Sequence, residues 1–375
     1  MKQVKKPVRT LAIVATGGVL GVGLLAGATS AQAQAPDPTA GPASGLISHT
    51  VSALGSADSY IASVRKYWTP ARMRGARAAD TALDRAQVAK LAADAAKNAQ
   101  AAPQSATPKA APNTAAKSSG SIAYGHNPTV KLSGAMKSSV ASVYKANEAA
   151  RKKAHRALKE SPTVGKVFFT RGGLNYVCSG SVIPSKWHNF VLTAGHCTNM
   201  AKKWDSKFTF VPYYHNGTAP YGSYPAKKMW TTSQWYNHNN NLNYAFQYDI
   251  SMVATYTYKG HYPGSYTGWN AIAFSKGTKY KVAAMGYPAE SPYGGEYQRY
   301  WRATTKKFHY GLYMKSGLTG GSSGGPWLVS YSNSKRRGVA YGVNSVGPAN
   351  GRGWMASPYF GYYAKKLWTQ VHNYH

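Results

Sequence analysis

Length, composition and charge narrow the classes of protein to which this chain can belong. It has 375 residues, with 45 Lys and Arg against 11 Asp and Glu, a formal net charge of +34 and two cysteines. Two cysteines cannot form a structural zinc site without two further ligands, and no histidine pair stands at the matching spacing, so we expect no metal and no cofactor.

The first 33 residues have the pattern of a secretory signal. A basic start is followed by an apolar run over residues 11–28 and by Ala31-Gln32-Ala33, a small-x-small cleavage site. The alternative is a membrane anchor, but the run is short for a bilayer span and is interrupted by glycines. We therefore expect a secreted, extracellular protein that has no membrane contact once the signal is removed.

Residues 34–160, rich in Ala, Lys, Ser and Pro, are expected to form a pro-region. Helical spacing of apolar residues predicts helices over 80–97 and 136–158, although their stripes are mostly alanine and too thin for an independent core. Residues 98–120 lack any large apolar side chain, which predicts a flexible linker. The basic cluster 151–153, with Arg156 and Lys159, offers exposed sites to processing enzymes.

From residue 161 the chain changes to short β-rich runs separated by turn-forming residues, which is the pattern of an all-β sandwich or barrel. Apolar residues at helical intervals over 360–371, after Ser357-Pro358, predict a terminal helix on this β body. The predicted strands are KVFFT (166–170), NYVCSGSVI (175–183), NFVLTA (189–194), KFTFVPYY (207–214), YDISMVATYTY (248–258), YKVAAMGY (280–287), WLVSYS (327–332) and GVAYGVNSV (338–346).

This β-rich part is strongly basic. It holds 23 Lys and Arg and four acids, Asp205, Asp249, Glu290 and Glu296, which leaves a net charge of about +19. Such a field attracts anionic partners. The basic residues are scattered through predicted strands and not gathered on one helix, so solubility and adhesion to anionic cell-wall polymers explain them better than specific nucleic-acid binding.

The two cysteines, Cys178 and Cys197, permit one intramolecular pair, and export favours a disulfide between them. The bridge would close a loop of about 20 residues and stabilise the fold by about 3 kcal/mol in the chain-entropy model. His196 stands next to Cys197. The bridge would therefore also fix the backbone beside this imidazole.

The segment GGSSGGP (320–326) has features that an acyl-transfer hydrolase needs. A serine in a glycine-rich turn can be held at an exposed backbone corner, where neighbouring N–H groups converge on one oxygen. Ser-Gly runs are more often flexible loops. Here Pro326-Trp327 leads directly into a predicted buried strand, which anchors the turn.

A serine nucleophile also needs a base and a group that orients the base. His196 is a candidate base, and Asp249 stands out among the few acids because it lies in an apolar, strand-like run. A buried carboxylate is costly unless it is hydrogen-bonded, and an imidazole N–H is a suitable partner. The alternative for Asp249 is a solvated position at the end of a strand.

In the order His, Asp, Ser, the segments TAGHC (193–197), YDISMV (248–253) and GGSSGGP resemble the trypsin-like (chymotrypsin-fold) serine peptidases. CSGSVI (178–183) and GVNSVG (342–347) are also similar to that family, and the likeness extends over about residues 165–372. GYPAESPYGGE (286–296) and GGSSGGPWLV make the secreted bacterial branch related to glutamyl endopeptidases the closer resemblance.

The resemblance implies two six-stranded antiparallel β-barrels with a C-terminal helix over residues 161–375. It implies that Ser323 attacks the substrate carbonyl, that His196 acts as general base and then acid, and that Asp249 orients His196. The N–H groups of Gly321 and Ser323 would form the oxyanion hole. The residues that it implies for substrate binding are Gly317, Thr319, Asn344, Ser345 and Gly347.

Three positions depart from the family pattern. Ser322 replaces the Asp that in many members receives the new N-terminus on activation, so activation by that ion pair is not expected, and the pro-region would instead block the cleft or aid folding. Gly317 replaces the Asp of peptidases specific for Arg or Lys, and Asn344 replaces a His of glutamyl-specific relatives. The basic field still favours an acidic substrate over a basic one.

The sequence therefore predicts a monomeric, secreted serine endopeptidase that is made as a precursor and acts on proteins or peptides. A non-catalytic protein of the same fold that binds anionic cell-surface polymers is one alternative. An esterase that uses the same three residues is another.

Overall fold

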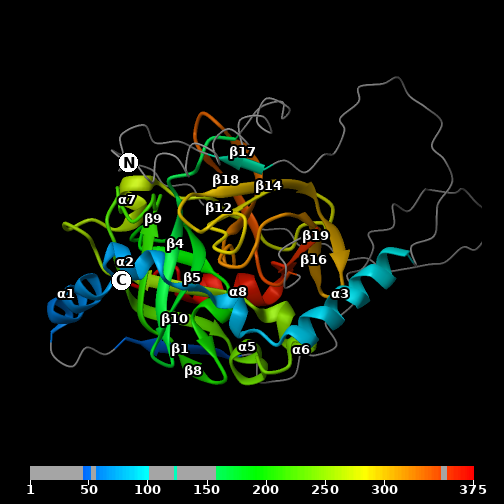
Figure 1. The fold of residues 1–375 in the computed structure, drawn as a ribbon, viewed down its shortest axis with the longest axis horizontal. Coiled ribbons are helices and arrows are strands. Elements are labelled where there is room, and N and C mark those ends of the chain that lie inside the picture. Colours follow the sequence, from blue (N-terminus) through cyan, green and yellow to red (C-terminus); the bar gives the residue numbers. More distant parts are fainter. Residues whose placement is uncertain (1–44, 52–55, 101–121, 125–157, 348–352) are drawn as a thin grey trace, which may run out of the picture. The chain divides into compact units, whose positions relative to one another are not determined.

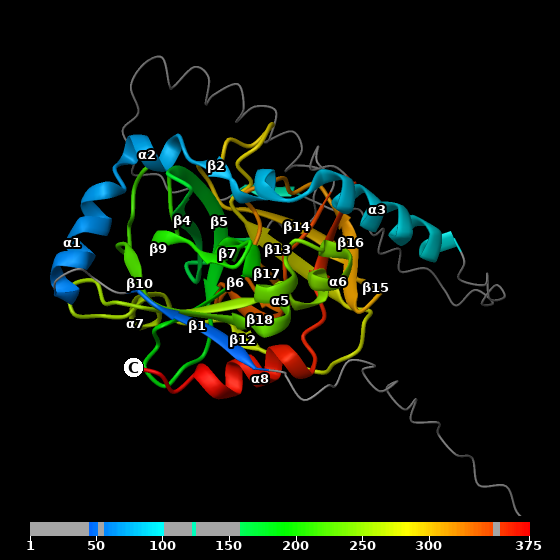
Figure 2. The same cartoon turned by 90° about the horizontal axis from the view of Figure 1, so that it is seen from below.

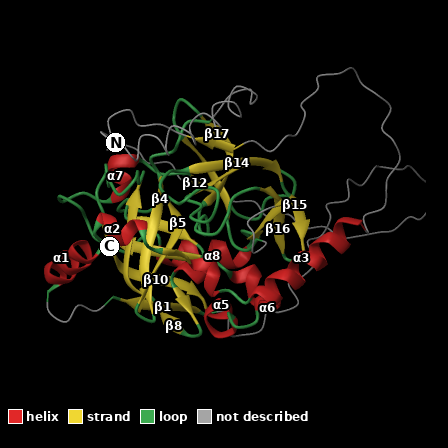
Figure 3. Ribbon diagram, in the orientation of Figure 1, coloured by secondary structure: helices red, strands yellow, loops and turns green. Residues whose placement is uncertain are grey.

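The computed structural model describes residues 45–51, 56–100, 122–124, 158–347 and 353–375. The predicted signal, all but the last residue of the predicted helix over 136–158 and most of the predicted linker lie outside these residues; Leu158, which is described, is not helical. Strands predominate over helices in the described part of the chain (Figure 3).

Six antiparallel strands close the first barrel, in the order β10, β11, β6, β5, β4, β9 and back to β10 (Figure 1). Its wall encloses apolar side chains such as Val167, Phe210 and Val253. The six strands are β4 (Val164–Arg171), β5 (Leu174–Val182), β6 (Phe190–Thr193), β9 (Ser206–Pro212), β10 (Tyr224–Thr232) and β11 (Ser251–Thr255).

The second half of the β-rich part consists of two sheets. Within the described residues, strand pairing does not close them into the second barrel that the resemblance implies, because β16 pairs with β15 and β19 alone and β12 is only two residues long. The first sheet has the order β12 (Ala271–Ile272), β18 (Arg337–Val343), β17 (Pro326–Ser332), β13 (Lys281–Gly286), β14 (Arg299–Thr304), β3 (Ile122–Tyr124), and the second β15 (Lys306–Phe308), β16 (Gly311–Ser316), β19 (Gly353–Pro358).

Apolar side chains hold the two sheets together. Met314 of β16, Trp327 of β17 and Met355 of β19 belong to one buried cluster. The second half therefore has a shared core without a continuous hydrogen-bonded wall. The cluster also contains Val282, Ala284, Leu312, Leu318 and Tyr341.

The predicted C-terminal helix is present as α8 (Tyr362–Val371), with Leu367 and Val371 buried. It begins four residues after Pro358 and not at Ser357-Pro358, because these two residues end strand β19 and pair with β16. The remaining short elements are β7 (Asn199–Met200), β8 (Lys203–Trp204), α5 (Ser233–His238), α6 (Leu242–Ala245), η3 (Phe246–Tyr248) and α7 (Pro263–Thr267).

Part of the predicted pro-region folds against the β-rich part. Strand β1 (Leu46–Thr50) extends the first barrel by pairing with β10, and β2 (Arg77–Ala78) pairs with β5. Helices α1 (Ala57–Tyr67) and α2 (Pro70–Arg74) precede β2, while η1 (Ala79–Ala82) and α3 (Arg85–Gln100) follow it (Figure 2).

The buried side chains of this segment share the apolar clusters of the β-rich part instead of forming a core of their own. Val64 and Trp68 belong to the cluster that contains Phe168 of β4, and the Trp68 indole N–H donates to the Lys207 carbonyl at 2.7 Å. The helix predicted from residue 80 begins instead at Arg85, because the exposed Asp84 carboxylate accepts the backbone N–H groups of Ala86 and Gln87. It ends at Gln100, three residues beyond the predicted end.

No helix in the described part of the chain is both long enough and apolar enough to cross a bilayer.

Candidate active site

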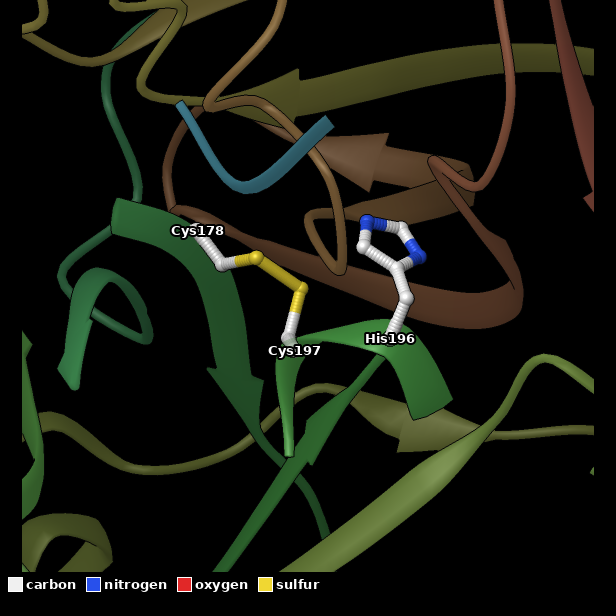
Figure 4. A group of neighbouring side chains, drawn as sticks. All are labelled: Cys178, His196 and Cys197. Atoms are coloured by element: carbon white, nitrogen blue, oxygen red, sulfur yellow. A yellow bond between two sulfur atoms is a disulfide. The ribbon is translucent and has the colours of Figure 1, made fainter. Parts of the chain in front are cut away.

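The candidate base, His196, lies in a short helical turn, η2 (Gly195–Cys197), directly after strand β6. A disulfide joins Cys197 to Cys178 of β5, with Cα atoms 6.1 Å apart, as predicted (Figure 4). The two sulfurs and the imidazole lie close together in a buried group that could suggest a metal centre. Because the sulfurs are bonded to each other, no thiolate is present to ligate a metal.

Asp249 is buried beside His196. One carboxylate oxygen, Oδ2, is 2.8 Å from His196 Nδ1, and the other accepts the backbone N–H of His196 at 2.8 Å. Oδ2 also accepts the hydroxyl of Ser345 at 2.6 Å. The side chain is 1% exposed, so the solvated alternative does not apply. Two bonds from one carboxylate fix both the position and the ring orientation of His196.

The glycine-rich turn that carries Ser323 is tied to the first barrel. The Ser179 N–H donates to the Ser323 carbonyl at 2.6 Å, and the Ser179 hydroxyl donates to the Gly321 carbonyl at 2.9 Å. Gly324 has φ +79°, and a Cβ there would lie 2.1 Å from Thr193 Oγ1. Only glycine therefore permits this close approach of the turn to β6.

The turn also closes on itself at Ser322, one of the departures from the family pattern. The Ser322 hydroxyl donates to the Thr319 carbonyl at 2.7 Å, and the Asn344 side-chain amide donates to the Ser322 carbonyl at 2.9 Å. At Ser322 the turn is therefore held by hydrogen bonds between neutral groups.

A residue of the predicted pro-region, Asp80 of η1, meets these groups. Its Oδ2 accepts the Gly321 N–H at 2.7 Å, and its Oδ1 accepts the Ser323 hydroxyl and lies 3.4 Å from His196 Nε2. The structure thus brings His196, Ser323 and Gly321 to one point, which is occupied by a carboxylate. Sequence reasoning missed Asp80, which it placed at the start of a surface helix.

The two carboxylates control the protonation of His196. Burial lowers the pKa of the imidazole, but the charges and hydrogen bonds of Asp249 and Asp80 outweigh it and raise the pKa to about 9. For Asp80, burial raises the pKa, and the hydrogen bonds from His196, Ser323 and Gly321 outweigh it, so the pKa is lowered. Protonated His196 paired with ionised Asp80 is therefore the stable form at neutral pH.

Two further groups hold His196 from behind, and neither was singled out from the sequence. The Arg171 guanidinium donates to the His196 carbonyl at 2.6 Å and forms two bonds to the buried Asp205, at 2.8 and 2.7 Å. The ring of Trp235 lies 6.4 Å from the imidazole, and Gly195 lets it approach, because a Cβ there would be 2.7 Å from the indole.

Of the five residues predicted to bind substrate, two line a cavity and three do not. Thr319 and Gly347 line a cavity of about 40 Å³ together with Leu318, Met355 and residues of the predicted pro-region. Ser345 bonds to Asp249, as described above. The Asn344 side chain is buried, accepts the Trp327 indole N–H at 2.8 Å and donates to the Met285 carbonyl at 3.1 Å.

Gly317, the fifth of these residues, lies against an indole. A Cβ at Gly317 would be 2.6 Å from the Trp301 ring, and the Tyr293 hydroxyl donates to the Gly317 carbonyl at 2.9 Å. Gly317 is not among the residues that line the cavity. The loop that contains Tyr293 thus contacts the turn before Ser323, a contact with no signal in the sequence.

A closed six-stranded barrel, with a histidine turn at one end and a glycine-rich serine turn packed against it, defines the class as a β protein of the chymotrypsin fold. Among solved structures, the protease Anisep from Arthrobacter nicotinovorans is 33% identical, with a TM-score of 0.53, over 57% of this chain and 96% of that chain. A thermostable serine protease, AL20, from an extremophilic microorganism is 28% identical, with a TM-score of 0.52, over 56% and 97%.

A Glu endopeptidase is 22% identical, with a TM-score of 0.45, over 57% of this chain and 92% of that chain. No family model matches the sequence, and no curated protein matches it. On the first of these similarities, the chain belongs to the trypsin-like (chymotrypsin-fold) serine peptidases.

Proposed function

We propose that this protein is a secreted serine endopeptidase, made as a precursor, that hydrolyses peptide bonds through His196, Asp249 and Ser323. The observation that carries the proposal is the position of Asp80. One of its oxygens is bonded to the Ser323 hydroxyl and lies 3.4 Å from His196 Nε2, so nucleophile and base face the same point.

In the proposed reaction Ser323 attacks the carbonyl carbon while its proton passes to His196 Nε2. The leaving amine takes that proton, and an acyl-enzyme remains on Ser323. Water then attacks the ester with His196 again as base, which releases the acid and restores the serine. Asp249 favours the tautomer of His196 that carries its proton on Nδ1, and it stabilises the imidazolium that forms in each step.

The Gly321 N–H is assigned to the oxyanion hole together with the N–H of Ser323. In the structure the Gly321 N–H donates to a carboxylate oxygen at 2.7 Å, which is the distance and charge that an oxyanion would present. The assignment of Thr319 and Gly347 to the substrate pocket is supported by their place in the cavity beside this turn. The glutamyl-endopeptidase branch and the preference for acidic substrates remain predictions from the sequence.

Secretion and processing rest on the sequence of residues 1–160. Among the predicted processing positions, Lys159 lies in the described part of the chain, where its N–H donates to Asn333 at 2.9 Å and its carbonyl accepts the Tyr331 hydroxyl at 2.8 Å. A protease needs a backbone that it can extend and reach. We therefore place the maturation cut before Leu158, at the basic cluster 151–153 or Arg156.

The test is Ser323→Ala in protein from which the pro-region has been removed. Hydrolysis of casein should fall by several orders of magnitude and labelling by a fluorophosphonate should disappear, because the three residues act as a unit. Ser334→Ala is the matched control, since Ser334 is an exposed serine in the turn between β17 and β18. Unchanged casein hydrolysis by Ser323→Ala would refute the assignment.

The same comparison separates the alternatives. A non-catalytic binder of anionic polymers would be unreactive to the fluorophosphonate and would bind polyanions in a salt-dependent way. An esterase would label at Ser323 but would hydrolyse a simple ester and not a peptide.

A further inference from the structure

A segment of the predicted pro-region, residues 77–91, lies across the catalytic cleft, and we call it the strap. It starts with β2, includes Asp80 and ends in the first turns of α3. In Figure 4 a blue ribbon, the colour of this part of the chain, passes beside the imidazole of His196.

We propose that the strap is an intramolecular inhibitor that binds the cleft in the direction opposite to a substrate and blocks it with the carboxylate of Asp80. The proposal rests on the proposed function and deepens it. It identifies the ligand of the cleft in the precursor and the kind of group, an anionic carboxylate, that the cleft holds.

The carboxylate occupies the positions at which the reaction would take place. Asp80 Oδ2 takes the N–H of Gly321, and Oδ1 takes the hydroxyl of Ser323. The same oxygen pairs with His196 Nε2, the nitrogen that would otherwise receive the serine proton. With Asp80 in place, no carbonyl can reach the nucleophile, and a charged imidazole cannot act as a base.

The direction of the strap follows from the order of its contacts. Its first residues, Arg77 and Ala78, pair in parallel with Tyr176 and Val177 of β5, directly before the disulfide that flanks His196. Its later residues, Leu83 and Val88, line the cavity with Thr319 and Gly347. The chain therefore runs from the side of His196 to the side of the cavity.

A substrate would run the other way. The acyl half of a scissile peptide bond is N-terminal and would lie along Ser345 and Gly347, while the leaving amine is C-terminal and must face His196 to receive its proton. The strap has these ends exchanged, so its own peptide carbonyls are not presented to Ser323 in an attack geometry. Reversal explains how a segment can occupy the cleft of an endopeptidase without being cut.

Anchors on both sides of Asp80 hold the carboxylate in the cleft. Before it, the Arg65 guanidinium donates to the carbonyls of Ser223 and Thr257, at 3.1 and 2.7 Å. After it, the Gln87 side chain accepts the Leu242 N–H at 2.6 Å and donates to the Asn240 carbonyl at 3.0 Å. Tethering at two points raises the effective concentration of Asp80 at the site.

The peptidase turn is already formed beneath the strap. The Ser322 hydroxyl is bonded within its own turn and Ser179 holds the carbonyls on either side of it. Activation therefore requires removal of the strap and does not require a new N-terminus to organise the turn.

The experiment measures the rate of fluorophosphonate labelling of the full-length precursor. Asp80→Ala and Asp80→Asn should be labelled at least about tenfold faster than the wild type, because each loses the charge that holds His196 and Ser323. The matched control is Asp84→Asn, since Asp84 is an exposed carboxylate of the same strap whose hydrogen bonds, among the described residues, go to Ala86 and Gln87 of the strap itself. It should label at the wild-type rate, and thermal melts should confirm that all variants are folded.

Equal labelling of the wild type and both Asp80 variants would overturn the proposal. Ser323→Ala in the Asp80→Ala background distinguishes this failure from failure of the proposed function, because labelling that survives in the double variant cannot occur at Ser323. Labelling that disappears in the double variant upholds the nucleophile whatever the effect of Asp80.

A separate measurement tests the direction in which the strap runs through the cleft. The intact mass of the wild-type precursor, followed during incubation, should show no cut within residues 77–83. A cut there at a rate independent of protein concentration would mean that the strap lies in the substrate direction, and would overturn the reversal.

Discussion

His196 has a carboxylate at each ring nitrogen, and the two carboxylates come from regions that are held in different ways. Asp249 faces Nδ1, is 1% exposed and lies between the first barrel and Ser345 of the second half. Asp80 faces Nε2, is 23% exposed and comes from the strap, which pairs with the barrel through a two-residue strand. In the proposed mechanism, the carboxylate that orients His196 is therefore built into the peptidase core, while the carboxylate that blocks it is carried on the strap.

The largest effect should come from removing the charge of Asp249, the carboxylate that belongs to the peptidase core. Asp249→Asn in the processed protein should lower kcat on a peptide substrate by about 10⁴-fold, because the amide favours the wrong tautomer of His196 and cannot stabilise the imidazolium. The measurement is steady-state kinetics, with circular dichroism to confirm the fold. A kcat within tenfold of the wild type would remove Asp249 from the mechanism.

A smaller effect should follow from removing the charge of Asp80, the carboxylate that belongs to the strap. In the precursor the pKa of His196 is raised to about 9 by Asp249 and Asp80 together. Asp80→Ala leaves Asp249 as the one carboxylate on the ring, so the pKa should fall below that value. An NMR titration of the His196 imidazole in precursor carrying Ser323→Ala, with and without Asp80→Ala, measures the difference. An unchanged pKa would mean that Asp80 does not pair with His196 in solution.

The sign of this shift also predicts how pH affects the strap. Because Asp80 raises the pKa of His196 above the value that Asp249 alone gives it, strapped protein binds a proton more tightly than unstrapped protein, and the stabilisation is complete below the pKa of His196 in unstrapped protein. It is lost as pH rises through about 9. The strap should therefore be held at neutral pH and should loosen in alkaline solution.

Much of the first barrel and of the site around His196, Asp249 and Ser323 could be predicted from the sequence, because the motifs that indicate them are short and local. Short β-rich runs separated by turn residues predicted β4, β5, β6 and β9, and the motifs around His196, Asp249 and Ser323 stand in the order of a known family. Among the strands of six or more residues, β10, β14, β16 and β19 were missed. In β10 and β14 the lysines and arginines interrupt the apolar alternation on which such predictions depend, although their long aliphatic stems can lie along a sheet.

The position of the strap in the cleft could not be predicted, because its contacts join residues that are far apart in sequence. Asp80 stands in an alanine-rich run that is indistinguishable from the start of an ordinary helix, and its partners Gly321 and Ser323 lie more than two hundred residues away. Arg171 and Asp205 are similar, since nothing near either residue predicts their pairing behind His196. Position in the fold, and not residue type, gives these groups their roles.

We propose that Ser323 is the nucleophile that His196 activates. The most direct measurement is to label the processed protein with a fluorophosphonate, digest it and locate the adduct by mass spectrometry. The account predicts one adduct, on the peptide that contains Ser323, at a rate that rises as His196 loses its proton. An adduct on another serine, or none in a preparation that cleaves casein, would contradict it.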